Sequence, residues 1–137
     1  MEQEQRIKRM TEIMVTSRHA NEDVGELVAA ALQQAGRDLG NDSRLVTGRP
    51  GSWEADILLR MARTGGTGNA KWIKALAALF VEMGNAGVDG GDEVSYAMSQ
   101  AVDDLGGLRE FAGASEWYND LVNIGCQYSR YEYMSAF

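Results

Sequence analysis

The segment Thr64-Gly-Gly-Thr-Gly-Asn-Ala-Lys71 has a composition that could bind phosphate, because a glycine-rich loop before a helix can point backbone N–H groups at an anion. A Walker phosphate loop needs glycine directly before its lysine and serine or threonine after it. Ala70 and Trp72 occupy those places, and Lys71 stands where a G-x-G-x-x-G pattern needs its last glycine. We therefore interpret the segment as a connection between two helices.

Metal and nucleophile chemistry have few candidate residues in this sequence. Residues 85–90 begin like a calcium loop, but Tyr96 holds the twelfth place, where that loop has a bidentate glutamate. His19 and Cys126 are the single histidine and the single cysteine, so neither a Cys/His zinc site nor an internal disulfide is expected. We expect no metal, no cofactor and no catalytic site, with catalysis by scattered carboxylates as the remaining alternative.

The charged residues divide the chain into segments of opposite sign. The formal net charge is −7, but residues 44–74 have six basic residues against two acidic ones, and residues 75–137 have two basic against ten acidic. The basic segment supplies candidates for contact with nucleic-acid phosphates, namely Arg44, Arg49, Arg63, Lys71 and Lys74. Because Asp56 precedes Arg60 by four residues and can pair with it on one helical face, a solvated surface is the competing interpretation.

A helix expected over residues 92–105 presents acidic residues around one tyrosine. Helical periodicity places Val94 and Met98 on its inner side and Tyr96 about 200° away from Val94, on the outer side. Aromatic side chains supply binding energy and carboxylates steer a basic partner. The candidate partner-binding residues of this helix are Asp92, Glu93, Tyr96, Asp103 and Asp104. The alternatives are an ordinary solvated face with one exposed aromatic, or a Tyr96 covered by another segment.

The last helix, expected over residues 115–135, is aromatic on two sides. Six of the eleven aromatic residues lie between Trp117 and Phe137. One interpretation places this helix in the core. In the other, its second apolar strip docks on another chain, which adds Tyr118 and Tyr133 to the partner-binding candidates and leaves a homodimer through this helix open.

Length and composition predict one helical domain spanning residues 1–137. The chain has 137 residues, of which 45% are apolar, and this suffices for a single buried core. It contains one proline and sixteen glycines, which fall mostly between apolar-periodic runs. The predicted fold class is all-α, a compact single-domain bundle of five to six helices with glycine-rich connections.

The helices needed to position these residues are expected over about 3–16, 21–36, 53–63 and 69–83, in addition to the two described above. The helix over 69–83 is apolar around most of its circumference and is predicted to be central, whereas residues 1–16 are a candidate peripheral helix. No apolar run approaches membrane-spanning length and the charged start does not resemble a secretory signal, so a cytoplasmic protein is expected, with no membrane contact.

These features favour a small acidic, non-catalytic interaction protein. We expect it to inhibit or regulate a larger protein by occupying a basic, nucleic-acid-binding surface of that partner. In size, charge and class alone it resembles the anti-CRISPR and anti-restriction proteins of phages and plasmids, and this likeness assigns no residue. The alternative is a helical nucleic-acid-binding regulatory module that uses the basic 44–74 segment.

Overall fold

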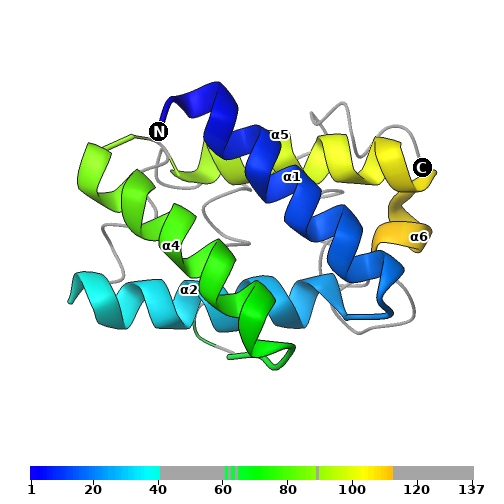
Figure 1. Ribbon diagram of the computed structural model, residues 1–137, viewed down its shortest axis with the longest axis horizontal. Helices are drawn as coiled ribbons and strands as arrows, with labels where there is room; N and C mark the ends of the chain where they lie inside the picture. The colour runs from blue at the N-terminus through cyan, green and yellow to red at the C-terminus, as the bar shows by residue number, and fades with distance from the viewer. Residues whose placement is uncertain (41–60, 62, 64, 89, 113–137) are drawn as a thin grey trace.

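The computed structural model describes residues 1–40, 61, 63, 65–88 and 90–112 (Figure 1). Within these residues 82% of the chain is helical and no strand occurs, which confirms the all-α prediction. The helices are α1 (Gln3–His19), α2 (Val24–Leu39), α4 (Ala70–Ala86), α5 (Gly90–Leu105) and α6 (Leu108–Ala112). The helix expected over 115–135 lies outside the described residues, as does nearly all of the one expected over 53–63. Arg44, Arg49, Tyr118 and Tyr133 lie outside them as well.

Short polar residues and glycines set the helix ends. Asp23 is the N-cap of α2, and its side chain accepts a hydrogen bond from the backbone N–H of Glu26 at 3.1 Å. The helix expected over 21–36 thus starts later than predicted, because Asn21 has a φ of 65° and belongs to the turn that follows α1. Asn69 caps α4, close to the start expected for the helix over 69–83, by accepting from the N–H of Lys71 at 2.9 Å. Gly87 then ends α4 in the left-handed conformation.

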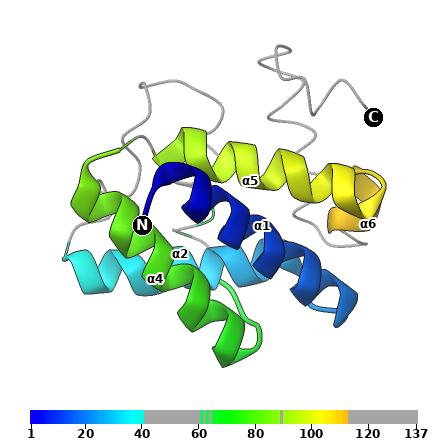
Figure 2. The same cartoon turned by 45° about the horizontal axis from the view of Figure 1, so that its top comes forward.

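The helices cross in two layers. Helices α1 and α4 lie side by side and run in opposite directions across α2 and α5 (Figure 1). Helix α4 packs mainly on α2 and helix α1 mainly on α5, so that α1 lies between α4 and α5 (Figure 2). Arg6 meets Glu93 and Thr11 meets the carbonyl of Ala97, which shows that α1 and α5 run in the same direction.

All five helices contribute to one hydrophobic cluster. Helix α1 buries Met10, Ile13 and Met14 almost completely, so it is not the peripheral helix considered for residues 1–16. Ten residues of α2 are buried, compared with six residues of α4, and α4 exposes Lys71 and Lys74. Helix α2 is therefore more central than α4, because its many alanines let neighbouring helices approach closely. None of the described helices is long and apolar enough to cross a membrane.

Candidate functional site

The outward side of α5 presents a tyrosine among carboxylates, as its periodicity predicts. The inner side of the helix is buried through Val94, Ala97, Met98 and Ala101. The opposite side is thereby directed to solvent, and Tyr96 is 61% exposed. Asp92 and Asp103 are exposed on this side of the helix with Tyr96, and the exposed Asp104 lies about 80° around the helix from Tyr96, toward α1. We call the set Asp92, Tyr96, Asp103 and Asp104 the acidic face of α5.

Glu93 is not part of the acidic face, which corrects the prediction that it binds a partner. Its side chain is fully buried and forms a two-pronged ion pair with Arg6 of α1. The Nε of Arg6 donates to Oε1 of Glu93 at 2.7 Å, and Nη2 donates to Oε2 at 2.8 Å. Glu93 lies about 100° from Val94 around the helix, on the side that meets α1, so it is enclosed rather than presented.

Arg6 has a structural role in positioning α1 and α5 that the sequence analysis missed. It is only 5% exposed and also donates to the carbonyl oxygen of Met1. The hydrogen bond that Arg6 donates to Glu93 raises the pKa of Arg6 above its ordinary value, so the guanidinium stays charged and neutralises the buried carboxylate. One signal was available, since Arg6 lies four and seven residues before the buried Met10 and Ile13 and thus on the inner stripe of α1.

A groove of about 700 Å³ runs between α1 and α5 beside the acidic face. Ile7 and Val15 line it from α1; both are half-buried and pack against the core. Thr11 lies between them and donates from its hydroxyl to the carbonyl oxygen of Ile7 at 2.8 Å. The lining from α5 includes Tyr96, which therefore borders both the groove and the acidic face. Sequence reasoning missed this α1/α5 groove because its two walls are more than 80 residues apart in the chain.

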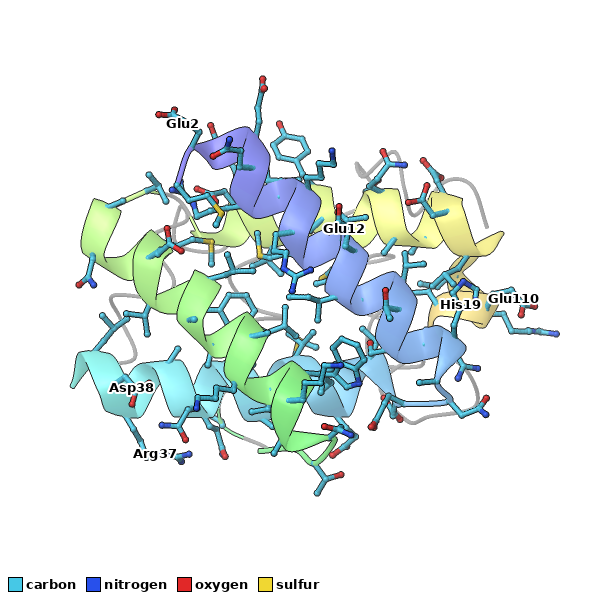
Figure 3. The ribbon with its side chains drawn as sticks, viewed as in Figure 1. Glu2, Glu12, His19, Arg37, Asp38 and Glu110 are labelled. Carbon is cyan, nitrogen blue, oxygen red and sulfur yellow. The ribbon has the colours of Figure 1, made fainter. Side chains whose placement is uncertain are left out.

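Acidic side chains outnumber basic ones along the α1/α5 groove. Glu4 and Glu12 line it from α1 and Asp104 from α5, and Lys8 is the one cation among the lining residues. Their existing contacts are surface contacts: Asp104 accepts from the side-chain amide of Gln100 at 2.8 Å, and Glu12 lies 3.5 Å from Arg9. Exposed contacts of this kind are worth little, so a docked cation can replace them at small cost. Figure 3 shows Glu12 on α1, where that helix crosses α5.

The loop before α4 is bound by carboxylates, which gives a physical reason for interpreting it as a connection. The N–H of Thr67 donates to Glu26 at 3.2 Å and the N–H of Asn69 donates to Glu22 at 3.1 Å. These two donors are therefore directed at acidic side chains of the α2 region, and the same negative charge opposes a phosphate. A Cβ at Gly66 would lie 2.0 Å from the carbonyl oxygen of Glu26, so this close approach requires glycine.

The described members of the basic set are exposed, and one of them directly follows the loop that these carboxylates bind. Arg63, Lys71 and Lys74 all face solvent, and Nζ of Lys71 lies 4.7 Å from the centre of the Trp72 ring. Lys71 follows directly on the loop that Glu22 and Glu26 bind, which lowers the local positive potential. Among the described residues, no three His, Cys, Asp or Glu side chains are grouped to hold a metal ion.

Comparison of the chain with protein-family models, with curated proteins and with solved structures found no match. The function is therefore inferred from the physical properties of the site.

Proposed function

We propose that this protein is a small acidic, non-catalytic interaction protein that binds a larger protein through the acidic face of α5. It acts as an inhibitor or regulator by covering a basic, nucleic-acid-binding surface of its partner. The observation that supports this proposal is the 61% exposure of Tyr96 on a helix side that it shares with Asp92 and Asp103, with the exposed Asp104 on the adjoining flank.

The combination of a ring and several carboxylates suits protein recognition. Tyr96 and Met1 are the large apolar side chains exposed among the described residues. A tyrosine buries a large area on binding at low entropic cost, and its hydroxyl can still find a partner. The carboxylates around it raise the association rate with a cationic surface and oppose binding of nucleic acid itself. A basic protein surface is thus the complement that this face fits best.

Affinity capture with matched charge variants tests the proposal. The bait is the whole chain, in lysate of the cells that naturally produce it, as wild type, Tyr96→Ala, Asp104→Lys and Asp38→Lys. Asp38 is a matched control because it is exposed on α2 (Figure 3). It accepts from Gln34 at 2.9 Å, as Asp104 accepts from Gln100 at 2.8 Å.

We expect a protein with a basic surface to be retained by wild type and Asp38→Lys and lost with Asp104→Lys and Tyr96→Ala. Equal retention by all four baits would refute the role of the acidic face.

A nucleic-acid-binding module is the second candidate, favoured by the exposure of Arg63, Lys71 and Lys74 beside the half-buried Trp72. Filter binding with duplex DNA and single-stranded RNA separates the two. Submicromolar affinity that falls steeply with salt and is lost in Lys71→Glu/Lys74→Glu would support the module and contradict the inhibitor.

The partner contacts expected of Tyr118 and Tyr133, and a homodimer through the last helix, remain predictions.

A further inference from the structure

The α1/α5 groove has the length and shape of a helix-binding site. Its lining residues from α1 recur on successive turns between Glu4 and Thr16. Twelve residue steps of α-helix correspond to about 18 Å, or slightly more than three turns. Tyr96 and Asp104 mark the opposite wall over nine residues of α5. Because both walls are helices, their backbone N–H and C=O groups are paired within each helix, and the groove offers no edge to an added strand.

The side chains along the groove define what its occupant must present. Half-buried Ile7 and Val15 provide apolar contact and the Tyr96 ring extends it. Glu4 and Glu12 stand along one wall and Asp104 on the other, so negative charge borders the apolar strip on both sides. The complement is an apolar stripe with cationic residues on each flank, which is the pattern of a basic amphipathic helix.

We propose that the α1/α5 groove receives one basic amphipathic helix of the partner protein. The apolar stripe of that helix contacts Ile7, Val15 and Tyr96, and its Lys or Arg side chains pair with Glu12 and Asp104. This inference rests on the proposed function and adds to it the structural element that the partner contributes. A second copy of this chain is a poor occupant, because its own acidic face would meet a groove of the same sign.

A synthetic peptide serves as the probe. It has about 15 residues, leucine along one helical face and lysine elsewhere. The first control peptide has the same composition in a scrambled order without an apolar face, and the second has glutamate in place of lysine. Binding is measured by fluorescence anisotropy of the labelled peptide, and its position by NMR shifts of the Ile7 and Val15 methyl groups. The protein variants are Glu12→Lys, which reverses one groove charge, and Asp38→Lys, which reverses an exposed charge on α2.

We expect the leucine–lysine peptide to shift both methyl signals and to bind Glu12→Lys roughly fivefold more weakly than wild type or Asp38→Lys, the scale of one or two exposed charge contacts. The scrambled and glutamate peptides should leave the methyl signals unchanged. If the leucine–lysine peptide leaves them unchanged, or if Glu12→Lys and Asp38→Lys weaken it equally, the groove is not a helix site.

The peptide and capture experiments fail independently. If the partner is lost with Asp104→Lys and Tyr96→Ala but the peptide leaves the Ile7 and Val15 methyl signals unchanged, the proposed function stands and the helix-binding inference is refuted. If the peptide occupies the groove but every bait retains the partner, the proposed function is refuted instead.

Discussion

Arg6 and Glu93 join the first helix to the fifth by a buried, two-pronged ion pair. Such pairs often add little net stability compared with well-packed apolar residues, because both charges must leave water. Removing one partner is costly, since the other charge remains buried without compensation. In this protein the pair lies at the start of α1 and α5 and fixes how the two helices align, which also sets the position of the groove.

Arg6→Met is therefore expected to lower the free energy of unfolding by about 3–5 kcal/mol, measured by urea denaturation. Arg6→Met/Glu93→Met should be clearly more stable than Arg6→Met, because it leaves no unpaired charge. The Glu93 hydrogen bond raises the pKa of Arg6, so the contribution of this guanidinium is complete below the ordinary arginine pKa and is lost only as pH rises through the raised value. Titration of Arg6 should thus contribute nothing to any change in the stability of the wild-type protein between about pH 6 and about pH 9. A double variant less stable than Arg6→Met would contradict this account.

At the scale of elements, the approach of the chain to α4 depends on contacts with α2. Glu22 and Glu26 hold the backbone of the preceding loop, and Gly66 lies against the Glu26 carbonyl. Asn69 then starts α4, which packs on α2. The loop has a composition that could bind phosphate, but these contacts agree with its interpretation from the sequence as a helix connection.

Gly66→Ala should lower the free energy of unfolding by about 2–3 kcal/mol, because backbone must shift to admit the Cβ. Gly87→Ala is the comparison variant: nothing lies within 4 Å of its Cβ, but its φ of 66° costs an alanine about 1 kcal/mol. Thermal unfolding followed by circular dichroism should rank Gly66→Ala as the less stable of the two. The reverse order would show that the loop yields easily at Gly66.

For the whole molecule, stability and recognition use different residues. The core includes fully buried side chains such as Phe80 and Phe111, whereas the ring of Tyr96 lies mainly at the surface. The formal net charge of −7 is concentrated toward the C-terminal half of the sequence. That half therefore repels polyanions and attracts cationic partners.

Tyr96→Ala should change the free energy of unfolding by less than about 0.5 kcal/mol, because the side chain is mostly exposed. Phe111→Ala, at a fully buried position, should cost about 3–5 kcal/mol. Both follow from urea titrations of the purified chain. A large loss of stability in Tyr96→Ala would mean that its ring supports the fold.

Association with the captured partner should slow as salt is raised from about 50 to about 300 mM, since screening shortens the reach of the carboxylates. Surface plasmon resonance with immobilised partner measures the association rate. Asp104→Lys should reduce both the rate and its salt dependence, while Asp38→Lys should change neither appreciably. A rate that does not vary with salt would argue against electrostatic steering.

The sequence predicted the outward side of α5 well, because a 3.6-residue period depends only on the helix itself. Val94 and Met98 were placed inward and Tyr96 outward without knowledge of any neighbour. It failed for Glu93, since whether a polar residue at the edge of the apolar stripe is exposed depends on the adjacent helix. The sequence also misjudged which helix is most buried, because the apolar composition of a helix does not reveal how closely its neighbours approach the alanine-rich α2.

By itself, the sequence determined the helical class, the start of α4 near Asn69 and the orientation of Tyr96, all of which arise from local periodicity and short-range hydrogen bonds. Only the tertiary structure paired Arg6 with Glu93 and brought Ile7, Glu12 and Val15 beside Tyr96 and Asp104. Those contacts join residues more than 80 positions apart, and their geometry is fixed by how whole helices pack around a shared core rather than by the pattern within any one of them.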